Sequence, residues 1–326
     1  HATIRRQRQM CIRDSPHFPQ GAQRIVTTGT FDGVHLGHRA LLDWMVDRAR
    51  SEGAESIVLT FDPHPRQVLF GDDSGLQLLQ TLDQRIAELA GTGLDHLVIQ
   101  PFDRDFARLK PTDFVRDVLV EGLGCTSVVV GHDHRFGAGR EGDVDLLRDC
   151  GEAYGFDVVH IPAHIEDELT VSSTKIRQRL TAGDCDGARL LLGRPHAWSG
   201  RVVHGDARGR TLGFRTANLV PVGEHQLTPG TGVYAVHVEG ESGHWKGMAH
   251  IGPRPTFDEG DEPATVEVHL FDDAPDLYGS VLSVHFETRL RDVMKFDGPD
   301  ALVAQLEQDA RAARAHLGER NGSSPR

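Results

Sequence analysis

The sequence predicts a chain of α/β class in two parts, a parallel sheet with helices followed by an antiparallel sheet with a closing helix. Up to about residue 160, β-branched runs alternate with amphipathic runs, which is typical of a parallel sheet with helices on both faces. After about residue 195, short alternating runs are separated by Gly, Pro, Asp and Glu, which predicts an antiparallel sheet or small barrel. The length of 326 residues favours about two domains.

In the first part, apolar and β-branched runs predict five strands. They lie at 24–28, 56–60, 96–99, 127–130 and 156–161. Apolar residues at helical spacing predict helices between them, at 40–49, 82–90, 114–121 and 144–154. Ligands of such sheets bind beyond the carboxyl ends of the strands, so the loops that follow these runs are candidates for a site.

A helical pair is predicted next, and it marks the end of the first part. The pair covers 173–181 and 184–192, and Gly193, Arg194 and Pro195 then interrupt the chain, so the boundary is expected near 184–195. The second part has alternating runs at 198–204, 232–239, 244–251, 264–271 and 281–288, and a final helix at 299–317.

Composition limits the partners. The chain has 35 Lys and Arg against 48 Asp and Glu, and its net charge of −13 argues against a nucleic-acid-binding surface. The four cysteines, Cys11, Cys125, Cys150 and Cys185, have no paired spacing, which indicates free thiols in a reducing compartment. No apolar run is long enough to cross a bilayer and no signal segment is evident, so we expect a cytoplasmic protein without a membrane partner.

Residues 1–21 differ from the rest of the chain. They begin with a basic stretch, lack periodicity and do not start with Met, so we interpret them as a foreign or disordered leader outside the fold. The alternative is a basic arm that binds nucleic acid.

The segment from Gly29 to His38, GTFDGVHLGH, lies between the first strand and the first helix. A helix N-terminus attracts phosphate through its unpaired N–H groups and positive dipole end, and glycine lets the backbone approach the anion. His35 and His38 share one face of the helix start and can stabilise charge at phosphorus. The segment resembles the HxGH signature of nucleotidyltransferases. The alternative is a capping turn with two solvent-exposed histidines.

Three other polar segments follow strands or begin helices in this part. The first, FDPHP at 61–65, is stiffened by its two prolines, and the second, GHDHRFG at 131–137, has Asp133 in a position to bind a ribose or a base. The third is SSTKIR at 172–177. A helix cap needs only one hydroxyl, so three hydroxyls followed by Lys175 and Arg177 better suit a triphosphate.

The second part carries its own candidates. Three glycines and two arginines at 205–213 form a loop able to wrap phosphates, although an ordinary glycine-rich hairpin has the same composition. Thr216 and Asn218 offer the oxygen ligands that Mg²⁺ prefers, or form a polar turn. In the run at 264–270, Glu267 and His269 lie on the face opposite Val266 and Val268, and from this pattern alone Glu267 is a solvent-facing carboxylate.

These segments, in this order, resemble the bacterial bifunctional riboflavin kinase/FMN adenylyltransferase (FAD synthetase) family. GTFDGVHLGH, TFDPHP, GHDHRFG and SSTKIR resemble its adenylyltransferase part, and LGRP, GRVVHGDARGRTLGFRTAN, IGPRPTF, VEVH, DLYG and LRDVMKF continue the resemblance to about residue 315. It implies a Rossmann-like nucleotidyltransferase domain at 22–184 and an antiparallel β-barrel riboflavin kinase domain with a terminal helix at 185–318. A leader at 1–21 and a tail at 319–326 remain.

The resemblance also implies two ATP-dependent steps. Riboflavin is phosphorylated to FMN with Glu267 as the base, and FMN is adenylylated to FAD with His35 and His38 stabilising the transition state. ATP is then a co-substrate, and Mg²⁺ is held by Thr216 and Asn218. The implied ATP- and phosphate-binding residues are Gly29, Phe31, Asp32, Gly37, Ser172, Ser173, Thr174, Arg177, Gly205, Gly209, Arg210 and Gly213. The implied flavin- or nucleotide-binding residues are Asp62, Asp133, Arg140 and Arg291.

Three residues depart from the family pattern. Arg215 stands where proline is usual, His134 where an aromatic residue is usual, and His250 where asparagine is usual. Two other functions stay open at this point. One is a nucleotidyltransferase for another phosphate acceptor with a non-catalytic second domain, against which Glu267 argues. The other is a non-catalytic flavin or nucleotide sensor, against which His35 and His38 also argue.

Overall fold

The computed structural model describes residues 10–12, 18, 21–71, 75–131, 134–162, 171–204, 214–252 and 266–319. These residues form two compact units. The first contains the chain up to Leu76 together with Leu82–Ser172, and the second contains Gln77–Thr81 together with the chain from Ser173 onward. The helical pair thus groups with the second unit, although we had expected the boundary near 184–195.

A six-stranded parallel sheet forms the first unit, in the order β1-β4-β3-β2-β5-β6. The strands are β1 (Met10–Ile12), β2 (Arg24–Thr28), β3 (Glu55–Asp62), β4 (His96–Pro101), β5 (Ser127–Val130) and β6 (Asp157–His160). The predicted parallel sheet is confirmed. The chain leaves β2 toward β3 and β4 and then crosses back to β5, so the strand order reverses between β2 and β5. Ligand sites of open α/β sheets form beyond the carboxyl ends of strands at such a point.

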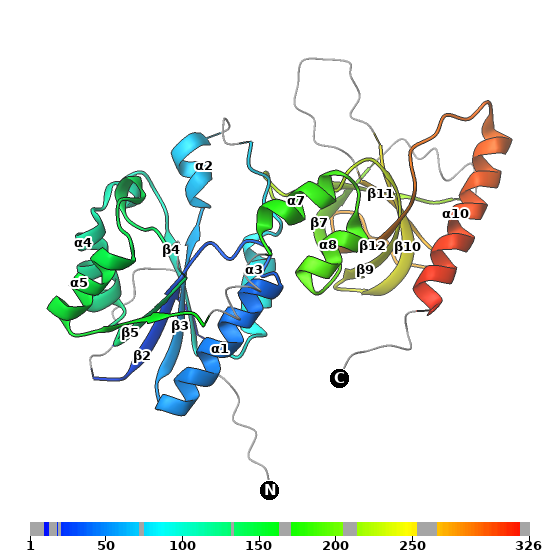
Figure 1. Ribbon diagram of the computed structural model, residues 1–326. Helices are drawn as coiled ribbons and strands as arrows, with labels where there is room; N and C mark the ends of the chain where they lie inside the picture. Colours follow the sequence, from blue (N-terminus) through cyan, green and yellow to red (C-terminus); the bar gives the residue numbers. More distant parts are fainter. Residues whose placement is uncertain are drawn as a thin grey trace, which may run out of the picture. The chain divides into compact units, whose positions relative to one another are not determined.

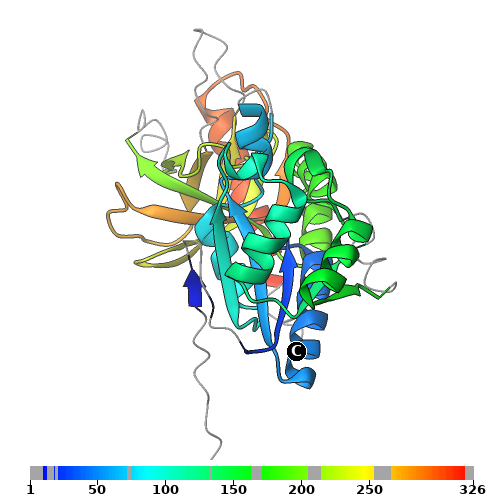
Figure 2. The ribbon, with the colours of Figure 1, turned by 90° about the vertical axis from the view of Figure 1, so that its left-hand side faces the viewer.

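Strand β1 lies inside the segment that we interpreted as a leader. It pairs with β4, with Met10 opposite His96, and its short dark-blue arrow lies at the sheet edge in Figure 2. Phe18 is also buried, and its backbone N–H donates to the carbonyl of Gly122. These parts of residues 1–21 therefore belong to the fold, which corrects the leader interpretation there. The strand is too short to show a periodic pattern.

Helices cover both faces of this sheet (Figure 1). On one face lie α1 (Leu36–Glu52) and α3 (Leu82–Ala90), and on the other lie α5 (Val144–Tyr154) and the pair α4 (Pro111–Asp113) and η3 (Phe114–Gly122). The predicted helix at 114–121 is a π-helix. Alternate strand residues pack on the two faces, since Ile25 and Val26 belong to opposite cores. Shorter helices are α2 (Pro65–Phe70), η2 (Phe106–Arg108) and η4 (Ala138–Arg140).

A closed antiparallel barrel forms the second unit, in the order β10-β11-β8-β7-β12-β9, as the resemblance implied. Its strands are β7 (His196–Val203), β8 (Ala217–Pro221), β9 (Gly232–Gly240), β10 (Gly243–Ile251), β11 (Val266–Leu270) and β12 (Val281–Arg291). Strand β8 was not predicted. Helix α10 (Pro299–Glu319) packs on the barrel through Ala313 and Leu317, which contact Ala235 and Met248 (Figure 1).

Two further pieces complete the second unit. Helices α7 (Ser173–Thr181) and α8 (Cys185–Leu192) precede the barrel. Residues Gln77–Thr81 join it through the backbone, because Leu78 donates its N–H to the carbonyl of His225 at 2.7 Å and accepts the N–H of Leu227 at 2.8 Å. No helix within the described ranges is long and apolar enough to span a membrane.

Candidate active sites

The segment GTFDGVHLGH forms the turn between β2 and α1, and its backbone is strained. Phe31 and Val34 have positive φ angles of 48° and 37°, which side-chain-bearing residues adopt at a cost of about 1–3 kcal/mol each. A Cβ atom on Gly29 would approach the Phe31 ring to 3.0 Å, and the N–H of Gly29 donates to the carbonyl of Leu59 at 3.1 Å. The surrounding fold therefore holds this loop in one conformation.

The two predicted catalytic histidines of this loop lie together. His35 is the N-cap of α1, and its Nδ1 accepts a hydrogen bond from the backbone N–H of His38 at 3.3 Å. A neutral His35 ring must then carry its proton on Nε2. The two rings stack, with centroids 3.6 Å apart, and the ring of Phe31 lies 5.0 Å from that of His38. Gly37 is buried in the first turn of the helix.

Burial keeps the His38 ring uncharged. The pKa of His38 lies well below its ordinary value, chiefly because of burial and secondly because of the neighbouring His35. Its Nδ1 is buried without a hydrogen-bond partner in the part of the chain that the structure describes. An unpaired buried ring nitrogen costs about 1–3 kcal/mol, so a ligand that pairs with it gains affinity. At neutral pH the His38 ring is therefore an uncharged hydrogen-bonding group, beside a helix N-terminus that attracts anions.

Two carboxylates of the predicted set flank this turn. Asp32 is buried within the loop, and Asp62 is the last residue of β3. Asp62 forms an ion pair with Arg85 of α3 at 3.2 Å. Arg85 is not among the residues predicted from the sequence, because a single arginine in an amphipathic helix carries no signal of a site.

The other residues predicted for this site belong to different units or lie outside the described residues. Arg140 is exposed in η4, which follows β5, and Asp133 lies outside the described residues. Ser172 belongs to the first unit, whereas Ser173, Thr174 and Arg177 begin α7 in the second. The structure of each unit alone therefore does not bring the segment SSTKIR to the histidine pair. His134, one of the departures, stacks on Phe136 with ring centroids 5.9 Å apart.

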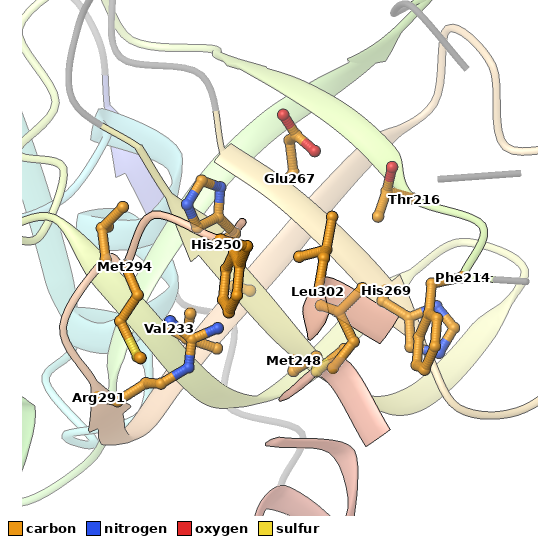
Figure 3. A pocket seen from close by; sticks show the side chains of 14 residues that line it. Phe214, Thr216, Val233, Met248, His250, Glu267, His269, Arg291, Met294 and Leu302 are labelled. Atoms are coloured by element: carbon orange, nitrogen blue, oxygen red, sulfur yellow. The ribbon is translucent and has the colours of Figure 1, made fainter. Parts of the chain in front are cut away.

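The second unit has a pocket on the face of the barrel wall that meets α10 (Figure 3). Val266 and Val268 point into the barrel, so Glu267 and His269 face the pocket. The polar residues of the lining are Thr216, His250, Glu267, His269 and Arg291. The other lining residues are Phe214, Val233, Met248, Ala249, Val293, Met294, Phe296, Leu302 and Leu306.

Strand register places three polar residues of this pocket, Glu267, His250 and Arg291, in one row across the barrel, and Asn218 continues the row. Asn218 lies opposite Glu267, Glu267 opposite His250, His250 opposite Val233, and Val233 opposite Arg291. Directly opposite residues of antiparallel strands point to the same face of the sheet. Glu267 is therefore a pocket residue between Asn218 and His250, and not the solvent-facing carboxylate that the strand pattern alone suggested.

His269, which was not predicted as a functional residue, holds the segment before β8 in place. The Nδ1–H of His269 donates to the carbonyl of Arg215 at 2.8 Å, and the His269 and Phe214 rings lie 5.0 Å apart. These contacts fasten residues 214–216 to β11 and keep Thr216 in the pocket. The alternation of side chains along the strand could have identified His269, because it lies two residues after Glu267 on the same face.

Arg291 lines the pocket, but its guanidinium is engaged elsewhere. It forms a bidentate ion pair with the buried Asp309 of α10, with Nε–Oδ1 at 2.9 Å and Nη2–Oδ2 at 2.7 Å. Its Nη1 donates to the carbonyl of Asp292 at 2.9 Å. Arg291 thus ties β12 to the helix that closes the pocket.

The pKa of His250 is lowered, chiefly by burial, which the negative charge of Glu267 opposes. This imidazole is therefore neutral near pH 7. The predicted phosphate-binding residues Gly205, Gly209, Arg210 and Gly213 lie outside the described residues. The described residues contain no group of three His, Cys, Asp or Glu side chains arranged to hold a metal ion. Oxygen ligands in this pocket come from Thr216, with Asn218 beside Glu267 on the next strand.

One unit has a histidine pair at a helix N-terminus, and the other has a carboxylate with hydroxyl and amide oxygens nearby. Together these groups are typical of a two-part phosphate-group transferase. A family profile described as "FAD synthetase" matches residues 18–175, and one described as "Riboflavin kinase" matches residues 192–317. A bifunctional riboflavin kinase/FMN adenylyltransferase of Escherichia coli K12 is 42% identical over 310 residues, covering 94% of this chain and 97% of the relative. One from Pseudomonas fluorescens is 40% identical, covering 91% and 94%.

The chain belongs to the bifunctional riboflavin kinase/FMN adenylyltransferase family. It has both activities, and the transferase for another acceptor and the non-catalytic sensor are set aside. Among solved structures, that of a chain named "Macrolide-efflux Protein from Streptococcus pneumoniae" superposes with a TM-score of 0.80 at 32% identity, covering 93% of this chain and 98% of that one. The two chains share a fold, and macrolide efflux is said of the Streptococcus pneumoniae protein alone.

Proposed function

We propose that the two activities are divided between two functional domains, with FMN adenylylation at His35 and His38 and riboflavin phosphorylation at the Glu267 pocket. The row Asn218–Glu267–His250 carries the second assignment, because Glu267 lies in a largely apolar pocket and is paired with Asn218, whose amide oxygen is of the kind that binds Mg²⁺. The stacked pair at the start of α1 supports the first. We assign the two functional domains to 22–184 and 185–318.

In the kinase step, Glu267 accepts the proton of the primary ribityl hydroxyl of riboflavin as this oxygen attacks the terminal phosphorus of ATP. Apolar side chains such as Val233, Met248 and Leu302 suit the flavin ring. The residues present fit Mg²⁺, since Thr216 and Asn218 offer hard oxygens and Mg²⁺ takes its other ligands from water and phosphate. Such an ion would neutralise phosphate charge. The loop at 205–213 would cover the phosphates.

In the adenylylation step, a phosphate oxygen of FMN attacks the α-phosphorus of ATP in line, and the bond to pyrophosphate breaks. No covalent enzyme intermediate is required, because orientation and charge stabilisation supply the rate enhancement. His35 and His38 donate hydrogen bonds to the phosphate oxygens, where negative charge develops. Ser172, Ser173, Thr174 and Arg177 are assigned to the departing phosphates, and Asp62, Asp133 and Arg140 to the flavin or the nucleotide.

Product analysis tests the proposal. The protein is incubated with riboflavin, ATP and Mg²⁺, and chromatography follows FMN and FAD over time; FMN should appear first and FAD later. Removing Mg²⁺ with a chelator should stop FMN formation. Loss of both activities in a folded variant changed in one functional domain alone would contradict the division. We place this chemistry in the cytoplasm, where thiols stay reduced, in keeping with the buried unpaired Cys125, Cys150 and Cys185.

A further inference from the structure

Arg85 of α3 is a buried cation that reaches the edge of the parallel sheet where the strands have their carboxyl ends. It is 6% exposed. Its Nη1 donates to the carbonyl of Thr30 at 2.9 Å, and its Nη2 donates to the carbonyl of Phe61 at 3.0 Å and to Asp62 Oδ1 at 3.2 Å. One side chain thus joins the loop after β2 to the carboxyl end of β3.

Keeping a charge in this position is costly for the fold. Burial lowers the pKa of the Arg85 guanidinium, and the negative charges of Asp62 and Asp32 oppose this effect. Its Nε is buried without a hydrogen-bond partner among the described residues. Apolar residues of similar volume often stabilise a fold as well as a buried ion pair does. Stability alone therefore gives little reason for arginine here, whereas its forked donors can hold two carbonyl groups at once.

The carbonyl of Thr30 accepts hydrogen bonds from two side chains. Besides the Arg85 Nη1–H, this carbonyl accepts the hydroxyl of Thr60 at 3.2 Å. The next residue is Phe31, whose φ of 48° is strained. Strained backbone persists only where its surroundings over-determine it, and two donors on the preceding carbonyl do so. The Phe31 ring in turn lies against His38.

We propose that Arg85 is a positioning residue of the adenylylation step: by fixing the Thr30 carbonyl it sets the places of Phe31 and of the histidine pair. Arg85 does not touch the reacting atoms. Its contribution is to hold the loop in the conformation that receives the phosphates before they bind. The inference rests on the proposed assignment of adenylylation to His35 and His38.

The first test compares Arg85→Gln and Arg85→Lys with the wild-type chain. A misplacement of about 1 Å can reduce a rate about 100-fold, so we expect Arg85→Gln to lower kcat for FMN adenylylation about 10- to 100-fold. Arg85→Lys keeps the charge but cannot fork between two carbonyls, so it should restore only part of the rate. Riboflavin phosphorylation by the same molecules should stay within about twofold of wild type. Arg116→Gln is the control, because Arg116 is a half-exposed arginine of the same unit.

A double-mutant cycle separates positioning from general loss of stability. Thr60→Val removes the second donor to the Thr30 carbonyl. If Arg85 acts through that carbonyl, the effects of the two substitutions are coupled, because both donors share one acceptor. The fold-reduction of kcat/KM in the double variant should then be smaller than the product of the two single fold-reductions. Independent losses, or a folded Arg85→Lys or Arg85→Gln with wild-type adenylylation, overturn the inference. If Arg85→Gln does not fold, Arg85→Lys and Thr60→Val carry the same cycle. A fully active His38→Ala would instead overturn the underlying assignment, whatever the Arg85 variants do.

Discussion

His250 and Glu267 lie directly opposite each other on β10 and β11, with both side chains in the same pocket. In the family pattern that the sequence resembles, the position of His250 carries asparagine, which has no titratable group. Here a neutral imidazole adjoins the carboxylate assigned as the base. Protonation of that imidazole would place a positive charge beside the carboxylate and weaken it as a proton acceptor.

His250→Asn should therefore change the pH dependence of riboflavin phosphorylation. Burial lowers the pKa of His250, so in the wild type this ring takes up its proton only on the acid side of its ordinary range. We expect log kcat to fall more steeply with decreasing pH in the wild type than in the variant, which lacks that second ionisation. Rate profiles of the kinase step from pH 5 to 8 measure this. Profiles of equal steepness would show that the imidazole does not influence the base.

Glu267→Gln should stop FMN formation and preserve FAD formation from added FMN. The substitution keeps the shape of the side chain and removes the base, so kcat of the kinase step should fall about 10²- to 10⁴-fold with a smaller change in KM. Each activity is assayed with its own flavin. Normal turnover of riboflavin would mean that Glu267 has no part in proton transfer.

His38→Ala should give the reverse result. Loss of a preorganised donor at the phosphate costs about 10²- to 10³-fold in kcat, and riboflavin phosphorylation should remain near the wild-type rate. The ring is partly packed against Phe31 and His35, so a thermal unfolding curve checks that the first unit still folds. A folded variant that makes FAD at the normal rate would rule out the histidine pair as the adenylylation site.

Arg215→Pro tests the departure before Thr216. The Arg215 side chain is exposed and its carbonyl accepts the His269 bond, so proline at this position should stiffen the segment and keep that acceptor. The segment then loses less conformational entropy when ATP binds, which is worth about 0.4–1 kcal/mol. KM for ATP in the kinase step should therefore fall about two- to fivefold. A rise of several-fold would mean instead that the guanidinium binds phosphate. FAD formation from FMN is the internal control.

Acid should destabilise the second unit through His196. This residue is 2% exposed at the start of β7, and burial lowers its pKa to about 4. The unfolded chain takes up this proton near pH 6.5, so the stabilisation is present above that pH and is lost as the pH falls from about 6.5 toward 4. Between pH 7 and pH 5 the loss is about 2 kcal/mol. Urea unfolding of the full chain at both pH values measures it.

His196→Gln supplies the comparison, because glutamine does not titrate and can still reach the carbonyl of Leu227, which lies 3.3 Å from His196 Nε2. The stability of this variant should change less between pH 7 and pH 5 than that of the wild type. Equal pH dependence in both proteins would assign the acid sensitivity to other groups.

Local patterns predicted much of the fold because the elements of the first unit are strongly periodic. The helix over 82–90 and the strand over 127–130 have the predicted bounds, since apolar spacing and flanking turns agree there. Strands β1 and β8 were missed for a different reason. Each is short, and its place in a sheet depends on partners far away in the sequence, β4 for one and β7 and β11 for the other.

The candidate sites show the same limit. His35 and His38 could be paired from their spacing alone, because one helix start holds both. Glu267 needed the family resemblance, since a strand pattern does not tell which face of a barrel is covered by a helix. Arg85 could not be found at all, because its role depends on the carbonyls of Thr30 and Phe61, which belong to two other segments of the chain.

Backbone pairing of Leu78 with His225 and Leu227 means that the second unit is not a continuous stretch of sequence. A gene fragment that begins near Ser173 encodes the barrel without Gln77–Thr81, and so lacks the buried Leu79 and Gln80. Recombination with a single crossover near Ser173 would likewise separate Gln77–Thr81 from the barrel to which they belong. We expect point changes to silence the two activities separately, whereas exchanging the two units between homologues requires a grafted loop as well as a junction.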